Sequence, residues 1–417
     1  MSISLRRLRR GWYTLRRLAR VHWRFLKDRN FAKLPLEKVN LTPTGRHATF
    51  TLLLRFNAKG GFALGLARKD HRTMIRSLTC RSLLVVFVLA FMGEAVADPP
   101  VVRNVRLKYT VEIAEIPTDA KTVDLWIPMP SENERQTIRL LNKSELGAGR
   151  ITKDKTFGNR LYYRRYELPS VTGGESKSAG IAPIKVELVY DAEVREATVA
   201  AAKQLISTKA EVPAGEFTPY LNDSQMIPIK GRITELARGI KLPPGEPLRA
   251  GRAIYDHLVS TMVYNYLAPG AGKGNAVWAC DSKTGDCTDF HSVFIGVCRW
   301  RGIPADHVFG LPMPPEKPAG EIKYCHCWAQ FWVADVGWIP IDASRANKFP
   351  KDREYYFGTL GSTWLTLAHG RDVVLEPPQQ GPPINMLHGP IAEINGQPFE
   401  GVHWLATYED RQESAAK

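Results

Sequence analysis

The sequence predicts an α+β protein in which a β-sandwich-like N-terminal domain precedes a mixed domain of helices and strands. Short stretches of alternating apolar and polar residues recur between residues 105 and 190, with turn clusters between them, as is typical of antiparallel strands. Helical spacing of apolar residues occurs at residues 233–240, at 248–264 and again from Cys287 to about Arg301. An aromatic-rich pair of strands follows at residues 324–344, which indicates a β-hairpin.

The positive charge of the chain lies almost entirely at its N-terminal end. The 417 residues are 44% hydrophobic and 24% charged, as is usual for globular proteins, and the net charge is +15. Residues 1–97 hold 20 of the 57 Lys and Arg but only 4 of the 42 Asp and Glu. The remaining 37 basic and 38 acidic residues nearly balance, so the body of the chain has no electrostatic footprint for nucleic acid.

Residues 74–97 are predicted to be a signal peptide. A basic start leads into the uncharged apolar run 83–93, and Ala95-Val96-Ala97 then forms a small-x-small cleavage site. The run is shorter than the roughly 20 residues that a membrane-spanning helix needs. We therefore expect cleavage after Ala97 and a periplasmic or secreted protein that meets the membrane only through this signal. An uncleaved membrane anchor is the alternative.

Residues 1–73 are predicted to be a basic extension that results from a start placed too early, with Met74 as the true initiator. A basic arm on the cytoplasmic side of an anchor and an Arg-rich organellar presequence are the alternatives. N-terminal sequencing of the mature protein should find Asp98 first, and any residue retained from before Met74 would contradict the misplaced start.

Residues 98–230 are predicted to form the β-rich domain and a linker. The predicted strands contain Val105, Thr122, Arg160 and Ile184, and prolines interrupt residues 201–230. The region has no group of residues typical of catalysis, so we interpret it as an accessory or packing domain, with an independent binding module as the alternative. Residues 373–417 are predicted to be a C-terminal β segment and a polar tail, also without catalytic residues.

Cys287 is predicted to be the first residue of an α-helix and a nucleophile. The apolar residues after it recur at i, i+3 and i+4 spacing, Asp286 is a good N-cap, and Asp289 adds a negative charge to the first turn. Unpaired N–H groups and the positive end of the helix dipole at this position favour a thiolate. A plain core cysteine is the alternative, and a nearby base is needed to decide between them.

The predicted hairpin supplies a base and a group to orient it. His326 and Asp342 are 16 residues apart, and a turn near Ala334 or Asp335 places them on one face of the ladder. A carboxylate on one ring nitrogen holds the tautomer in which the other nitrogen accepts a proton. Cys287, His326 and Asp342 are therefore predicted to be nucleophile, general base and orienting carboxylate.

Four motifs resemble the core of the transglutaminase-like superfamily, a group of papain-like cysteine enzymes with exported bacterial members. The motifs are 285–291, 302–305, 326–329 and 337–344. A weaker similarity extends over most of residues 100–400 and includes Gly370-Arg371-Asp372. Family members often carry an Asn-Arg pair before that element, where this chain has Ser362-Thr363-Trp364. The resemblance implies a papain-like, transglutaminase-like catalytic domain at residues 231–372 and the same triad.

The predicted triad of Cys287, His326 and Asp342 indicates an enzyme that catalyses acyl transfer on an amide bond. The substrate would be a protein or peptide amide, with cell-wall peptide as one candidate. Hydrolysis by a protease or amidase is favoured, and transamidation by a transglutaminase is the other outcome. A catalytically inactive binding or scaffold protein is the alternative. No cofactor or metal is predicted, because the glycine-rich loop 269–274 lacks the order of a phosphate loop and no calcium-loop or Cys-x-x-Cys motif occurs.

Three further assignments concern the surroundings of Cys287. Trp278 is predicted either to line the acyl pocket and offer its indole N–H to an oxyanion, or to be a packing residue. His291 is predicted to be a packed or hydrogen-bonded residue beneath the site. Cys280 could form a disulfide with Cys325 or with Cys327, and Cys298 is predicted to be a core thiol. These four are the cysteines of the predicted mature chain other than Cys287.

Overall fold

The computed structural model describes residues 50–56, 62–68, 101–169, 181–200, 202 and 215–411. The chain divides into two compact units, residues 1–96 and 97–417. In the first unit, β1 (Phe50–Phe56) and β2 (Phe62–Arg68) form an antiparallel pair. The predicted signal segment lies outside the described residues, so export and the site of cleavage stay predictions.

Within the described residues, no helix has both the length and the apolar character required to cross a membrane.

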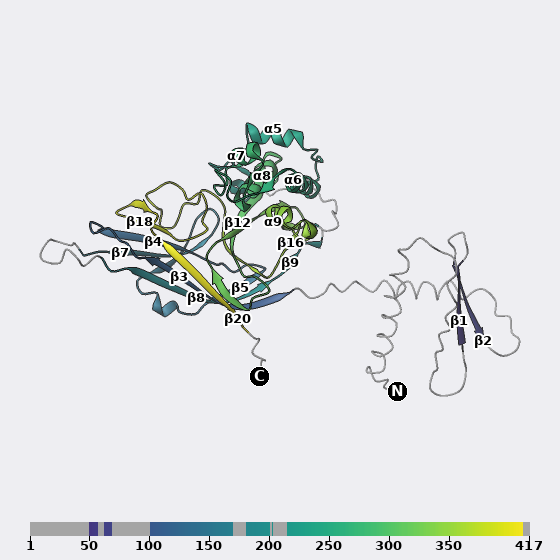
Figure 1. Ribbon diagram of the computed structural model, residues 1–417, viewed down its shortest axis with the longest axis horizontal. Coiled ribbons are helices and arrows are strands. Elements are labelled where there is room, and N and C mark those ends of the chain that lie inside the picture. Colours follow the sequence, from purple (N-terminus) through teal and green to yellow (C-terminus); the bar gives the residue numbers. More distant parts are fainter. Residues whose placement is uncertain are drawn as a thin grey trace, which may run out of the picture. The chain divides into compact units, whose positions relative to one another are not determined.

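The second unit begins with two antiparallel five-stranded sheets (Figure 1). The order of the first is β13 (Ala319–Ile322), β20 (His403–Asp410), β3 (Val102–Ile113), β8 (Ile184–Arg195) and β5 (Gln136–Leu140). The order of the second is β19 (Gln397–Phe399), β18 (Ile391–Ile394), β4 (Thr122–Met129), β7 (Arg160–Glu167) and β6 (Arg150–Lys153).

The two sheets share one hydrophobic core. Alternate residues of β3, among them Val105, Leu107 and Val111, are at most 1% exposed, as expected of strands with one face on a core. They pack in one cluster with Leu125 and Ile127 of β4 from the other sheet. Face-to-face packing of this kind is the predicted β-sandwich. The C-terminal segment completes it, because β20 pairs with β3 and β18 pairs with β4.

A four-stranded antiparallel sheet and a group of helices form the rest of the unit. The sheet order is β15 (Gly337–Ile341), β14 (His326–Val333), β12 (Ala305–Pro312) and β17 (Trp364–His369). The helices are α4 (Thr218–Leu221), α5 (Arg232–Gly239), α6 (Pro247–Thr261), α7 (Ala276–Ser282), α8 (Cys287–Trp300) and α9 (Ala343–Lys348). Short elements complete the second unit: β9 (Ala197–Thr198), β10 (Val263–Tyr264), β11 (Thr284–Gly285), β16 (Thr359–Leu360), η1 (Lys143–Glu145) and η2 (Pro350–Asp352).

Helix α8 is the centre of this region. Its residues from Cys287 to Arg299 are all buried, and they pack with α5, α6, α7 and the inner face of β14. A helix that is buried on every side lies in the interior of its domain, with neighbouring elements all around it. The α+β class is therefore confirmed. The domain boundaries stay predictions, and Ile227 of the predicted linker is fully buried in the same core as α8.

Candidate active site

Cys287 opens α8, as the sequence predicts. Asp286 is the N-cap and accepts hydrogen bonds from the Thr288 N–H at 2.8 Å, while the Asp289 carboxylate accepts from the Asp286 N–H at 3.0 Å. This reciprocal arrangement is a capping box, and an N-cap typically contributes about 1 kcal/mol. Cys287 is 8% exposed. The thiol is therefore fixed at the positive end of a buried helix.

The hairpin brings His326 and Asp342 together. His326 is the first residue of β14, and Asp342 follows β15 as the N-cap of α9. His326 Nε2 lies 2.7 Å from Asp342 Oδ2. The other carboxylate oxygen accepts from Arg345 N at 2.9 Å and from Ser344 Oγ at 2.7 Å, so the carboxylate cannot rotate freely. The Trp364 ring lies over the imidazole, with centroids 4.6 Å apart.

The charges favour an ion pair between Cys287 and His326. A hydrogen bond from Cys327, followed by the charge of His326, holds the pKa of Cys287 well below its usual value in spite of burial. Burial alone would lower the pKa of His326, but the negative charges of Asp342 and Cys287 raise it to about 10. Burial likewise opposes ionisation of Asp342, yet His326 keeps the pKa of that carboxyl well below its usual range. Thiolate, imidazolium and carboxylate are therefore the favoured forms near neutral pH.

Cys327 is a site residue that the sequence analysis missed. The sequence offers it as a disulfide partner of Cys280, but the residues that the structure describes include five free thiols: Cys280, Cys287, Cys298, Cys325 and Cys327. Cys280 belongs to the helical core, whereas Cys327 packs against Cys287 and Phe309. The proposed disulfide from Cys280 is therefore wrong for this structure. The sequence feature that could have identified Cys327 as a site residue is its position directly after His326 in the strand.

The hydrogen bond from Cys327 can be tested by mutation. Replacing Cys327 with alanine should raise the pKa of Cys287, because the thiolate loses a donor, while serine should restore part of the effect. A hydrogen bond to a charged group is worth about 1.5–3 kcal/mol, so alkylation of Cys287 by iodoacetamide at acidic pH should slow by about tenfold or more. Identical pH–rate profiles for the wild type and Cys327→Ala would contradict this role.

His291 lies beneath the site, in agreement with the sequence analysis. Its side chain is fully buried, Nδ1 is 3.6 Å from Cys327 Sγ, and Nε2 is 3.5 Å from Asp342 Oδ1. Trp278, by contrast, packs on α7 with its indole ring against Gly270. Its role towards an oxyanion stays a prediction.

Arg371 joins the elements that surround the site. The guanidinium is 3% exposed; Nη1 donates to Ser292 Oγ at 2.9 Å and to His307 Nδ1 at 3.2 Å, and Nη2 donates to the Gly274 carbonyl at 3.2 Å. Burial lowers the pKa of Arg371 to about 10, so it remains a cation at neutral pH. The Gly370-Arg371-Asp372 element thus contains an arginine whose hydrogen bonds link the elements around the site. The sequence alone did not predict this structural role of Arg371.

One cluster has the residue types of a metal site. Ligand atoms of His291, His307 and Cys327 lie within 4.8 Å of one another. Arginine only donates hydrogen bonds, so His307 Nδ1 must accept from Arg371, and the proton of the neutral ring then sits on Nε2. His307 therefore has no lone pair left for an ion, and the neighbouring guanidinium would repel one. A hydrogen-bonded cluster is the better interpretation.

Backbone N–H groups of the glycine-rich loop are hydrogen-bonded to a side chain of α8 and are not free to bind a phosphate. The Gly272 and Gly274 N–H groups donate to the two oxygens of Asp289 at 2.8 and 3.1 Å. Burial of Asp289 raises the pKa of its carboxyl to about 6. The amides that would bind a phosphate are thus occupied by a side chain of the helix that carries Cys287.

Gly274 should be the most sensitive glycine of this loop. Its φ is +60°, and a Cβ added there would lie 2.8 Å from Arg371 Nη1 and 3.0 Å from Ser292 Oγ. We expect Gly274→Ala to lower the free energy of unfolding by about 2–4 kcal/mol, combining left-handed strain with displacement of Arg371. Gly302→Ala is the matched control, because φ is +76° there but no atom lies within 4 Å; it should cost about 1 kcal/mol. Equal losses in urea unfolding would show that the Arg371 contact has no role.

Comparisons with known proteins agree with this geometry. Residues 234–343, which contain Cys287, His326 and Asp342, match the family model described as the transglutaminase-like superfamily. An "Uncharacterized protein" of Haemophilus influenzae is 25% identical over 312 residues, which cover 66% of this chain and 82% of that protein.

Two crystal structures show a more distant similarity. A "Putative Cysteine Protease" from Cytophaga hutchinsonii is 13% identical, with a TM-score of 0.48 over 76% of this chain and 93% of that chain. A "putative protease" from Parabacteroides distasonis is 14% identical, with a TM-score of 0.23 over 63% of this chain and 47% of that chain. The match of residues 234–343 to the family model identifies a transglutaminase-like core within the mixed region.

Proposed function

We propose that this protein is a thiol-dependent acyl-transfer enzyme that acts on amide bonds through Cys287, His326 and Asp342. The observation that best supports the proposal is the 2.7 Å contact between the His326 ring and the Asp342 carboxylate, next to a thiol at a capped helix start. A nucleophile, a base and a group that orients the base are the requirements for covalent catalysis by cysteine.

In the proposed mechanism the Cys287 thiolate attacks the carbonyl carbon of the amide, and the carbonyl electrons move to its oxygen. The backbone N–H of Cys287, which has no partner within a helix, is the proposed donor to that oxyanion. The His326 imidazolium gives its Nδ1 proton to the leaving amine, since Nε2 is engaged by Asp342. The C–N bond breaks, and a thioester on Cys287 remains.

The second half of the cycle decides the type of enzyme. His326, now neutral, removes a proton from water, the hydroxide attacks the thioester, and Cys287 leaves as a thiolate. An amine in the place of water would give transamidation. We favour hydrolysis, because water reacts with the thioester unless a site excludes water and admits a second substrate.

Mass spectrometry of reactions with peptides tests the proposal. The full chain should cleave members of a peptide pool that includes cell-wall peptides, so that two products appear whose masses sum to the substrate plus one water. Loss of ammonia together with incorporation of an added amine would indicate transamidation. A chain that shows neither reaction, and whose Cys287 alkylates no faster than Cys298, would favour the inactive scaffold.

A further inference from the structure

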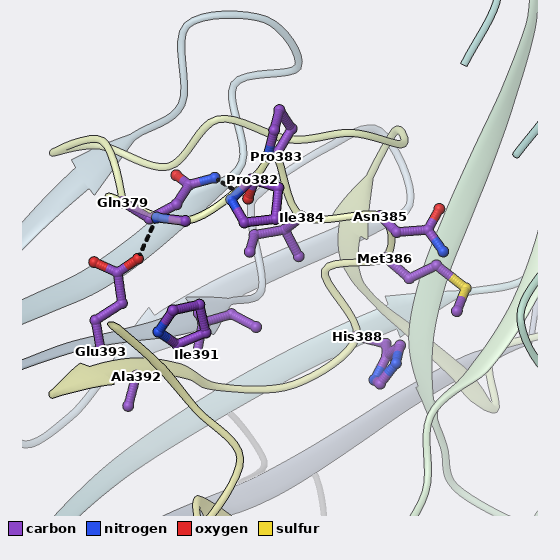
Figure 2. Close-up of a pocket in the computed structure, with 12 residues that line it drawn as sticks. Gln379, Pro382, Pro383, Ile384, Asn385, Met386, His388, Ile391, Ala392 and Glu393 are labelled. Carbon is purple, nitrogen blue, oxygen red and sulfur yellow. Dashed lines mark hydrogen bonds between the residues drawn. The ribbon is translucent and has the colours of Figure 1, made fainter. Parts of the chain in front are cut away.

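A cavity of about 310 Å³ lies beside the candidate site, formed by the segment 379–393 and Pro398 (Figure 2). Its lining is largely apolar: Pro382, Pro383, Ile384, Met386, Ile391 and Pro398. In Figure 2, Gln379 and Glu393 lie at one end of the lining, and Met386 and His388 lie at the other. The volume is sufficient for one large side chain of a ligand.

Two polar side chains of the lining, Glu393 and Gln379, are already hydrogen-bonded to the protein. The two oxygens of Glu393 accept from the Gln380 and Gly381 N–H groups at 2.9 and 2.7 Å. The Gln379 amide accepts from Leu375 N at 2.9 Å and donates to the Pro382 carbonyl at 2.9 Å. Lysine and arginine are absent from the lining. A negative side chain would find no cation in the lining, and the Glu393 oxygens that a positive side chain would need already accept from backbone N–H groups, so burying either charge would be costly.

The shape of the cavity is fixed by contacts within the protein and does not depend on a ligand. Val373 and Ile384 exchange two backbone hydrogen bonds of 2.8 and 2.9 Å, which close the segment into a loop. The prolines restrict its backbone further, and the Gln379 and Glu393 bonds hold it from within. A preformed apolar cavity loses little entropy when it binds.

One wall of the cavity belongs to the candidate site. Met386 packs against the cluster of Cys287, Phe309 and Cys327. The His388 ring lies 6.3 Å from the Phe309 ring, centroid to centroid. Trp364, which covers His326, is in a separate cluster with Val308 and Trp328. In the proposed mechanism His326 protonates the leaving amine, so the amine half of the substrate lies towards His326. We therefore place the acyl half on the side of Cys287 that faces Met386.

We propose that this cavity is the acyl-side specificity pocket of the enzyme and that it takes a large, uncharged, apolar side chain of a peptide substrate. The proposal rests on the acyl-transfer function of Cys287 and names the substrate class for it. A leucine or phenylalanine side chain matches the cavity in size and in its lack of charge.

The test uses the full chain and two kinds of probe. Acetyl-Gly-X and acetyl-X-Gly chloromethyl ketones, with X as Leu, Phe, Ala, Glu or Lys, alkylate a nucleophilic thiol with release of chloride. Iodoacetamide reports the intrinsic reactivity of Cys287 without using the pocket, and peptide mapping confirms which thiol is labelled. For one of the two positions, Leu or Phe should react at least about tenfold faster than Glu or Lys, as expected for burial of one such side chain.

Two variants locate the preference. Ile384→Trp fills the cavity and should reduce the ratio of Leu to Lys labelling to less than about threefold, each rate being divided by the iodoacetamide rate of the same variant. Val374→Trp is the matched control, since Val374 is 46% exposed, lies shortly before the segment 379–393 and does not line the cavity; it should keep the wild-type ratio. Ile391→Trp replaces Ile384→Trp if that variant does not fold.

The outcomes separate this proposal from the function on which it rests. If iodoacetamide labels Cys287 rapidly and the wild type shows no preference among the side chains at either position, the pocket is overturned and acyl transfer stands. Equal loss of the preference in Ile384→Trp and Val374→Trp also overturns it. If Cys287 is not more reactive than Cys298, both proposals fail.

Discussion

Replacing Cys287 with alanine should abolish amide turnover and chloromethyl ketone labelling, with a loss of at least about 10³-fold, and should leave the fold intact. Burial raises the pKa of the other thiols, for Cys280 to about 12, so they are protonated at neutral pH. A thiol with that pKa is ionised to only about one part in 10⁵ at pH 7, and the thiolate is the reacting species. Removing one small buried side chain should cost about 1 kcal/mol of stability.

Cys298→Ala is the matched control for this prediction. Cys298 lies on the same helix and is fully buried, but it belongs to the helical core rather than to the site. Turnover and labelling should stay within about twofold of the wild type, while urea unfolding should show a comparable loss of stability in both variants. Substantial labelling of Cys287→Ala, mapped to Cys325 or Cys327, would instead show that another thiol is the nucleophile.

The parts of the site that the sequence predicted are those fixed by local rules. A helix start at Cys287 follows from an N-cap and apolar spacing, and the shared face of His326 and Asp342 follows from an even separation across a hairpin. Both depend on neighbours in sequence. They can therefore be predicted without knowledge of any tertiary contact. The same holds for the alternating strands of the sandwich.

The parts that the sequence did not predict depend on distant segments. Arg371 meets Ser292 and His307 only because β12, α8 and the chain after β17 converge. The contact of Cys327 with Cys287 requires strand β14 to lie against the start of α8. The cavity likewise forms from a proline-rich segment within residues 373–417, which the sequence predicts to be a β segment and tail without catalytic residues. Spacing rules cannot predict such contacts, because they carry no information on how separate elements pack.

The contact between His326 and Asp342 leads to the second large effect. Asp342→Asn keeps an N-cap for α9, since asparagine is as good a cap as aspartate, but it removes the negative charge that helps to raise the pKa of His326. The imidazolium then loses its proton at lower pH, and Cys287 loses a positive neighbour. The pKa of Cys287 is lowered in the wild type, so its thiolate is present above that lowered value; in the variant the acid limb of the alkylation rate should move to higher pH.

The size of this effect can be bounded at pH 6. A thiol of ordinary pKa, about 8.5, is ionised to only ~0.3% there, although the more basic thiolate is the better nucleophile and offsets part of the loss. Alkylation by iodoacetamide should therefore slow by about 10- to 100-fold, and turnover should fall by about 10²- to 10⁴-fold, because the base is also no longer oriented. Asp306→Asn is the control: Asp306 is a buried carboxylate 2.8 Å from His369 on the same sheet. If both variants shift the alkylation profile alike, the effect is a general loss of buried charge and Asp342 has no special role towards Cys287.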